Sequence, residues 1–484
     1  MRNSASKYQD IVMTDQESTG PRASDQKTNT ELLFAADRRH LLHPQHHPID
    51  HQQPVLWVSG DGPYLIASDG RKYLDGLSSM WNVNLGHSHR ELIDAAHTQL
   101  STLPFATAYA GSSHRPVIEL ASMLSEIVYP SIKAFYFTNA GSDATDTSIR
   151  TSRFFWRTLG RPEKTKIIAR QLSYHGSSVG SASATGVAEF SDVFGPRLPG
   201  FLHIDSPYPY RFGDDNNGKS QGIAAADLLE EAILREGPES VAAFIAEPIQ
   251  GGGGGVIVPQ DDYFPRIREI CNRYEVLLIS DDVITGFGRS GRWFGLQHWG
   301  VEPDIVQFAK GITGGYIPLG GIGVSARIKD VLDHADPGKR WWHGYTYSGH
   351  PVACAVAIAS INVLRRERLV ERSAILGERL LSRLRDGLAA HPHVGEVRGL
   401  GLLAGIELVA DKPTKLRFPS TANFSGRLKA EFMARGLCTR VLTDIICLAP
   451  PLICTDQEID RIADIIVDTL NANFATTADF ASTN

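Results

Sequence analysis

Charged side chains directly follow short apolar runs at two places in this sequence. Asp281 and Asp282 come after "VLLIS" (276–280), and Lys310 comes after "DIVQFA" (304–309). A lysine in an apolar setting loses solvation of its charged form, which lowers its pKa and makes the neutral amine a nucleophile. A single lysine more often extends its charged end into solvent. Paired acids at the end of a neighbouring run favour the chemical interpretation.

Small and aromatic residues follow two further apolar runs. Gly141 and Ser142 come after "AFYFT" (134–138), and at a helix start their N–H groups could bind a phosphate or a carboxylate. The alternative is an ordinary helix N-cap at Ser142. Tyr174, after "KIIA" (166–169), could stack on a planar ligand or be a core tyrosine. A flat cationic ring with a phosphate and an aldehyde, pyridoxal 5'-phosphate (PLP), would use all four groups together.

Strand and helix signals alternate beyond about residue 115, and these elements must position the four groups. Amphipathic helical runs such as Ala224–Arg235 and Tyr263–Tyr274 separate several of the strand candidates, which are 134–138, 166–169, 241–246, 276–280, 304–309 and 320–324. Short apolar strands alternating with helices predict an α/β fold with a mainly parallel sheet covered on both faces. Ligands bind beyond the carboxyl ends of such strands, so we expect the four groups to meet there.

The two ends of the chain differ from this middle part. The polar start predicts a flexible tail, whereas the last third alternates helices with short strands, as in "VGEVRGLGLLAGIELV" (394–409). An N-terminal hairpin is expected to complete this smaller α+β domain. We therefore predict a tail at 1–35, the N-terminal part of the small domain at 36–90, a large cofactor-binding domain at 91–350 and the C-terminal small domain at 351–484.

Composition excludes several classes of function. A net charge of −6 over 484 residues provides no basic surface for nucleic acid or anionic membranes. The five cysteines include no CxxC pair, which favours a reducing compartment over a zinc ribbon or a disulfide framework. Without an export signal or an apolar run of about 20 residues, the chain is expected to be cytoplasmic. The histidines of 40–52 could bind a metal, but their irregular spacing favours a solvated loop, and no metal is predicted.

Longer motifs in the correct order resemble the class III aminotransferases of the omega-amine:pyruvate kind, over about residues 36–470. "SDDVITGFGRSGRWFG" is similar to the family's D-E-V-x-T-G-F-G-R block, "PDIVQFAKGITGGYIPLGG" to its lysine block, and "HGYTYSGHPVACA" (343–355) to its phosphate-threonine block. The resemblance implies a fold type I PLP-dependent transferase with a mainly parallel seven-stranded sheet in its large domain. It also implies a homodimer with active sites at the interface, and whether dimers pair into tetramers stays open.

The resemblance also assigns roles to individual residues. Lys310 resembles the Schiff-base lysine, which also moves the proton during the reaction. The other cofactor-binding residues that it implies are Asp281 at the pyridine nitrogen, Val283 and Tyr174 on the two ring faces, Gly141 and Ser142 at the phosphate, and Thr346 at the phosphate of the other subunit.

Substrate binding is assigned with alternatives. Arg440 resembles the mobile arginine that binds the keto acid's carboxylate, for which its planar fork is suited, although it could be an exposed arginine entering a strand. Trp81 resembles a pocket aromatic near the substrate. Together with Tyr109 and Trp342 it suggests a roomy pocket for bulky or long-chain amines, but each could equally belong to an interface or the core.

Three departures from the family's motifs bear on its branches. Gly252 and Ile284 stand where the ornithine and 4-aminobutyrate branch has a glutamate and a glutamine, which favours amine:pyruvate chemistry. Asp282 replaces the family's glutamate. Because adjacent strand residues point to opposite faces, we expect Asp282 to face away from Asp281 and to be a structural anchor.

The predicted function is therefore a ping-pong transamination from a primary amine to a keto acid, most simply pyruvate giving alanine. A PLP-dependent aminomutase or decarboxylating enzyme on the same scaffold is one alternative. A non-catalytic scaffold that binds a phosphate ligand is another. A hydride-transfer dehydrogenase would need a glycine-rich dinucleotide fingerprint, which the sequence lacks.

Overall fold

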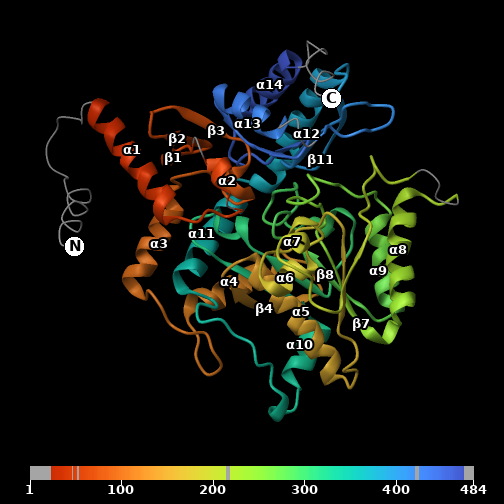
Figure 1. Cartoon of the computed structure of the whole chain (residues 1–484). Coiled ribbons are helices and arrows are strands. Elements are labelled where there is room, and N and C mark those ends of the chain that lie inside the picture. Colours follow the sequence, from red (N-terminus) through yellow and green to blue (C-terminus); the bar gives the residue numbers. More distant parts are fainter. Residues whose placement is uncertain (1–22, 46, 52–53, 214–217, 420–423, 474–484) are drawn as a thin grey trace. The chain divides into compact units, whose positions relative to one another are not determined.

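The computed structural model describes residues 23–45, 47–51, 54–213, 218–419 and 424–473 (Figure 1). The chain divides into two compact units, one of residues 1–59 and 66–71 and the other of residues 60–65 and 72–484. The first unit holds helix α1 (Ala23–His40), the short 3-10 helix η2 (Pro48–His51) and most of strand β1 (Trp57–Asp61). Every predicted site residue belongs to the second unit.

Helix α1 corrects part of the flexible tail predicted for residues 1–35. Residues 1–22 lie outside the described residues, but 23–35 are helical. The second half of α1 contains alanine, leucine, arginine and one glutamate, which are strong helix formers. Basic residues in its last turn interact favourably with the negative end of the helix dipole. The domain boundaries that follow the tail stay a prediction.

A seven-stranded sheet organises the second unit, in the order β4-β10-β9-β8-β7-β5-β6. Its strands are β4 (Ile132–Thr138), β5 (Lys166–Arg170), β6 (Phe201–Ile204), β7 (Val241–Ala246), β8 (Leu277–Asp281), β9 (Ile305–Phe308) and β10 (Gly320–Ser325). Neighbouring strands from β6 through β9 pair in parallel, whereas β10 pairs antiparallel to both β4 and β9. The predicted α/β fold with a mainly parallel sheet is confirmed.

Helices cover both faces of this sheet. Phe244 of β7 packs into one core with α8 (Gln221–Glu236) and α9 (Tyr263–Arg273), and the next residue, Ile245, packs into another. The helices on that second core include α5 (Gly141–Thr158) and α10 (Ala326–Asp333). Figure 1 shows α8 and α9 lying side by side. Burial on both faces explains why these strands are unbroken apolar runs.

The C-terminal part of the second unit contains an antiparallel sheet, in the order β11-β12-β15-β14. Strand β3 pairs in parallel with β13, which brings an N-terminal strand to this part of the chain. The strands are β3 (Lys72–Asp75), β11 (Val394–Gly399), β12 (Ala404–Leu408), β13 (Leu437–Cys438), β14 (Arg440–Leu442) and β15 (Ile445–Leu448), and the helices are α11 (Pro351–Arg366), α12 (Leu369–Leu388), α13 (Phe424–Ala434) and α14 (Asp456–Asn473).

The remaining elements are short or lie between these parts. They are β2 (Tyr64–Ala67), α2 (Ser78–Trp81), α3 (Arg90–Thr102), α4 (Arg115–Ser125), α6 (Val179–Ala184) and α7 (Glu189–Asp192). None of the helices in the described part of the chain has the length and apolar character needed to cross a membrane.

Candidate active site

A cavity of about 180 Å³ lies where the carboxyl ends of the central strands meet. The predicted residues that line it are Gly141, Ser142, Tyr174, Asp281, Val283 and Lys310. Since β4, β5, β7, β8 and β9 run in one direction, the residues after them reach the same edge of the sheet. The fold therefore brings together, in one cavity, predicted residues that are far apart in the sequence.

Helix α5 presents its N-terminus to this cavity. It begins at Gly141, and its N-cap residue Ala140 makes no side-chain capping bond. The alternative of an N-cap at Ser142 is wrong, since the Ser142 Oγ accepts a hydrogen bond from the N–H of Ser177 at 3.2 Å. A Cβ atom on Gly141 would lie 3.2 Å from the Cγ1 of Val283, so glycine permits this close approach. First-turn N–H groups have no acceptor within the helix and form an anion site with the helix dipole.

Asp281, the last residue of β8, pairs with a buried histidine. Its Oδ2 lies 2.6 Å from the Nδ1 of His175, and its Oδ1 accepts the N–H of Val283 at 3.2 Å. The hydroxyl of Thr185 accepts the N–H of His175 at 3.0 Å, which fixes the histidine backbone. The Nε2 of His175 is buried without a hydrogen-bond partner. His175 was not among the site residues predicted from the sequence, because its contact with Asp281 joins two distant parts of the chain.

Asp282 points to the opposite side of the strand and contacts no predicted site residue. Its Oδ2 accepts the hydroxyls of Tyr129 (2.9 Å) and Ser280 (2.6 Å). Its Oδ1 accepts the hydroxyl of Thr285 (2.7 Å) and the N–H of Gly295 (2.5 Å). Burial raises the pKa of this carboxyl, although the four donors oppose the rise. The prediction of a structural anchor facing away from Asp281 is confirmed.

Glu247 is a second acid of the cavity that sequence analysis did not propose as a site residue. It follows β7 and is buried, with Oε1 accepting the N–H of Tyr174 and Oε2 that of Gly251, both at 3.0 Å. Burial raises its pKa, and nearby Asp281 adds to the rise. Glu247 directly follows the apolar run "VAAFIA" (241–246), just as Asp281 follows "VLLIS". The same strand-end pattern could therefore have predicted Glu247 as a site residue.

Lys310 lies partly buried at the start of the 3-10 helix η5 (Lys310–Thr313), which follows β9. Its φ of 47° is in the left-handed region, a strained conformation for a residue with a side chain. Among the described residues its Nζ has no hydrogen-bond or ion-pair partner. Burial, and to a smaller extent Arg440, lowers the pKa of its amine, while Asp281 and Glu247 oppose this. The amine is therefore free to react.

Two predicted substrate residues lie near the cavity without lining it. Trp81 is buried and packs in one cluster with Ile284, a cavity residue. Arg440, the first residue of β14, places its Nη1 3.7 Å from the Sδ of Met80. The positive charge of Arg440 contributes to the lowering of the pKa of the Lys310 amine.

Tyr109, Thr346 and Trp342 are exposed and do not line the cavity. The hydroxyl of Tyr109 lies 2.6 Å from where a Cβ atom on Gly344 would stand, so it belongs with the surface segment that carries Thr346. Within one chain, the structure does not bring these three residues to the other predicted site residues.

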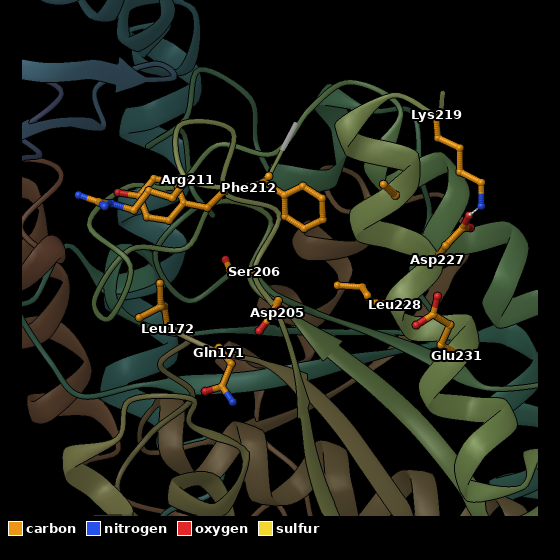
Figure 2. Close-up of a pocket in the computed structure, with 13 residues that line it drawn as sticks. Gln171, Leu172, Asp205, Ser206, Arg211, Phe212, Lys219, Asp227, Leu228 and Glu231 are labelled. Carbon is orange, nitrogen blue, oxygen red and sulfur yellow. Dashed lines mark hydrogen bonds and ion pairs between the residues drawn. The ribbon is translucent and has the colours of Figure 1, made fainter. Parts of the chain in front are cut away.

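A larger cavity of about 550 Å³ lies beside α8, next to the ends of β5 and β6 (Figure 2). No predicted site residue lines it. Its charged residues include Lys219 and Asp227, which form an ion pair at 2.6 Å, and Arg211, which binds Glu407. Chemistry rather than size therefore distinguishes the smaller cavity as the candidate active site.

The fold and this cavity define a PLP-dependent enzyme of the aminotransferase type. An anion site at a helix start, a buried carboxylate and an amine without a partner fit the phosphate, the ring nitrogen and the aldehyde of PLP. The chain belongs to the class III aminotransferase family, since the family described as "Aminotransferase class-III" matches residues 47–470. It is an aminotransferase, and PLP is the cofactor of this family.

Individual relatives agree with this assignment. The chain is 42% identical over 431 residues to a putrescine–pyruvate aminotransferase of Pseudomonas aeruginosa, covering 88% of this chain and 93% of the relative. It is 44% identical to an (S)-enantioselective omega-transaminase structure from Thermomicrobium roseum, with a TM-score of 0.88 and coverage of 92% and 99%. An omega-transaminase from Pseudomonas jessenii in complex with PMP is 38% identical, with a TM-score of 0.88 and coverage of 92% and 98%. The predicted family and fold class are confirmed.

Proposed function

We propose that this aminotransferase moves an amino group from a primary amine to pyruvate, giving alanine and an aldehyde or ketone. The observation that carries the proposal is the unpartnered Lys310 amine in the same cavity as the Asp281–His175 pair. The likeness to a putrescine–pyruvate aminotransferase and to omega-transaminases supports the amine and pyruvate as substrates. The aminomutase, decarboxylating and non-catalytic alternatives gain no support from these relatives.

The cavity residues divide the work of holding the cofactor. The N–H groups of Gly141 and Ser142 would bind its phosphate, Val283 and Tyr174 would contact the two faces of its ring, and Lys310 would hold it covalently. When bound, PLP supplies an aldehyde that takes up the amino group and a ring that spreads negative charge toward its nitrogen. Asp281 would keep that nitrogen protonated, because a nearby negative charge favours the cationic form.

Lys310 would also move the proton. Once released from the cofactor by the incoming amine, its neutral Nζ would take a proton from the carbon that bears the amino group and would give it to the carbon of the cofactor that receives the nitrogen. The lowered pKa of the Lys310 amine keeps a larger fraction neutral near pH 7 than in a solvated lysine. His175 would keep the Asp281 carboxylate in place, since its Nδ1 occupies one carboxylate oxygen.

Substrate choice depends on residues at the cavity wall. Ile284 lines the cavity with an apolar side chain, and a Cβ atom on Gly252 would stand 3.6 Å from the Cβ of Tyr174. No acid at position 252 is present to pair with Arg440, so we propose that Arg440 binds the carboxylate of the keto acid. Trp81 would limit the amine side of the pocket.

We further propose a homodimer in which Thr346 of one chain contacts the phosphate bound by the other. Thr346 is exposed and lies outside its own chain's cavity. Large aromatic residues around it are also exposed, including Trp342 (76%), Tyr347 (57%) and Tyr109 (50%). Several exposed aromatic side chains near one segment favour a protein interface, where Tyr109 could reach the partner's substrate. Pairing of dimers into tetramers is left to mass measurement.

We propose a cytoplasmic location because the cysteines, all within the described residues, form no disulfide bonds, as is usual in a reducing compartment. All five are free, and four of them are buried. Cell fractionation with an antibody to the chain would test the location, and recovery in a secreted or membrane fraction would contradict it.

The test of substrate class uses the purified holoenzyme with a panel of primary amines, including putrescine. We expect alanine to form from pyruvate, and Arg440→Met to raise the KM for pyruvate by about 10- to 100-fold through loss of a charge-assisted pair. Arg385→Met is the control and should leave this KM unchanged, because Arg385 is an exposed residue in the last turn of α12 whose side chain donates to the carbonyl of Val397. Transfer to 2-oxoglutarate but not to pyruvate, or decarboxylation without alanine, would contradict the proposal.

A further inference from the structure

Arg289 is a fully buried arginine that the proposed reaction does not use. It lies in the turn after β8, and its guanidinium binds oxygen atoms from three separate segments rather than a carboxylate. Its Nη2 donates to the Oγ of Ser78 at 2.9 Å and to the Oδ1 of Asn84 at 2.7 Å. Its Nη1 donates to the carbonyls of Leu402, at 3.2 Å, and Pro450.

The charge of Arg289 is costly at this place. Its side chain is 0% exposed, and its Nε has no hydrogen-bond partner. Burial lowers the pKa of the guanidinium to about 10, while the nearby charge of Asp75 opposes this. Taking an arginine out of water without an ion-pair partner is offset only by well-placed acceptors. Arg289 therefore requires the segments that supply these acceptors to stay in place.

The first of these segments is strained and carries Trp81, which packs with the cavity residue Ile284. Ser78, Ser79 and Trp81 have φ values of 47°, 57° and 65°, in the left-handed region that residues with side chains avoid. Such strain persists only where surrounding contacts over-determine the backbone. Arg289 binds the Ser78 side chain, and the carboxylate of Asp75 accepts the N–H of Ser79 at 2.8 Å. These two contacts hold the turn that positions Trp81.

Asn84, in the same segment as Ser78, connects Arg289 to Lys310. The Nδ2 of Asn84 donates to the carbonyl of Phe287 at 3.1 Å and lies 2.5 Å from where a Cβ atom on Gly311 would stand. Asn84 therefore packs directly on the residue that follows Lys310. Lys310 itself has a left-handed φ, so contacts on its neighbour fix an unfavourable backbone geometry.

We propose that Arg289 is a positioning residue for the active site, acting on the Trp81 turn through Ser78 and on the Lys310 backbone through Asn84. The part of this inference that concerns catalysis rests on the proposed function of Lys310 and Trp81. It goes beyond that function because it states that Arg289, which lies outside the cavity, keeps both the Trp81 turn and the Lys310 backbone in their strained conformations.

The two arms of the network have different expected effects. Arg289→Met keeps much of the side-chain volume but removes all the hydrogen bonds, so it should lower kcat/KM by about 10- to 100-fold, as small misplacements of reacting groups do. It should also weaken the visible circular dichroism of the bound cofactor, which reports how rigidly the ring is held. Asn84→Ala should lower kcat and weaken the dichroism, whereas Ser78→Ala should raise the KM for the amine and leave kcat unchanged.

Arg268→Met is the matched control. Arg268 is partly buried, with 20% of its side chain exposed, and its guanidinium pairs with Asp304 at 2.9 Å. Among the described residues, its hydrogen bonds reach neither strained segment. We expect this control to lower the melting temperature without changing kcat/KM or the dichroism. Lys310 and Trp81 stay intact in all these variants.

The outcomes separate the inference from the proposed function. A wild-type protein that binds PLP but makes no alanine contradicts the function by itself, before any variant is measured. A normal wild-type enzyme whose Arg289→Met variant loses only melting temperature, as the Arg268→Met control does, overturns the positioning role. Where Arg289→Met does not fold, unchanged kinetics and dichroism in both Asn84→Ala and Ser78→Ala overturn it instead.

Discussion

Asp281 and Asp282 have the same side chain and are both buried, yet the hydrogen bonds around them differ. Asp281 faces the cavity, where His175 and the N–H of Val283 are its partners. Asp282 faces away and accepts hydrogen bonds from four donors in the protein. The first arrangement leaves the carboxylate available to a ligand cation, and the second uses both oxygens for structure.

Substitutions at these two positions should therefore separate activity from stability. Asp281→Asn should lower kcat by about 100-fold or more, because a charge that stabilises the transition state is lost, while the melting temperature of the apoenzyme stays near that of the wild type. Asp282→Ala should lower the melting temperature, since each buried donor left unpaired costs about 1–3 kcal/mol. Thermal denaturation and steady-state rates measure both effects. The opposite pattern would contradict the assignment.

The pH dependence of cofactor uptake follows from the pKa of Lys310. An amine must be neutral to react with an aldehyde, so the rate at which the apoenzyme takes up PLP should rise as the pH rises through this pKa. Burial lowers it, whereas the negative charge of Glu247 raises it. Glu247→Gln should therefore move the midpoint to lower pH, which stopped-flow absorbance can follow. Glu239→Gln, at an exposed acid paired with Arg161, should leave it unchanged. A shift to higher pH would contradict the proposed electrostatics.

At the scale of elements, the site depends on the close approach of α5, the loop after β5 and the turn after β8. Gly176 allows one of these approaches, because its φ is 131° and a Cβ atom there would lie 2.5 Å from the Oγ atoms of Ser142 and Ser181. The residue thus brings the Tyr174–Ser177 loop against the N-terminus of α5, where the phosphate is expected.

Gly176→Ala should therefore weaken PLP binding by about tenfold or more, because both strain and steric contact act on the phosphate site. The control is Gly160→Ala just beyond the other end of α5, where φ is also positive (79°) and nothing lies within 4 Å of the added Cβ atom. Equilibrium dialysis of the apoenzyme measures the affinity. Equal losses of PLP affinity in both variants would show that backbone strain causes the effect, and not the contact between the 174–177 loop and the N-terminus of α5.

Much of the sheet could be predicted because its central strands are buried on both faces and are continuous apolar runs. Strand β6 was not predicted, since Phe201–Ile204 is short, includes a histidine and is only half-buried at the sheet edge. The site residues that follow these strands could also be predicted, because recognising a strand locates the residues at its carboxyl end. The Asp281–His175 contact could not, because it joins the end of β8 to the loop after β5, and their approach depends on tertiary packing.

For the whole molecule, the predicted site residues that do not line the cavity of their own chain bear on the number of subunits. Thr346 and Tyr109 could not be placed in a site from a single chain, which agrees with a contribution from a partner. Phe105 and Tyr347 form an exposed aromatic pair with ring centres 5.7 Å apart, close in sequence to these residues. We therefore expect activity to require a second copy of the chain.

Dimer formation predicts a mass near 106 kDa, twice the chain mass of 52.9 kDa, in light scattering after gel filtration. Tyr347→Asp should shift the protein toward monomer and lower activity in parallel, because a charge in an apolar interface is costly. Phe194→Asp, at a residue that is 83% exposed elsewhere, should change neither. A fully active monomer would contradict the shared site.

The proposed function requires that the amine of Lys310 carries the cofactor. Reduction of the PLP-loaded enzyme with borohydride fixes the cofactor on the amine that holds it, and peptide mass spectrometry then locates the modified lysine. We predict modification of the peptide containing Lys310, its loss in Lys310→Ala, and no change in Lys164→Met, which removes another buried lysine of lowered pKa (about 8). Modification of a different lysine, or none in a protein saturated with PLP, would contradict the account.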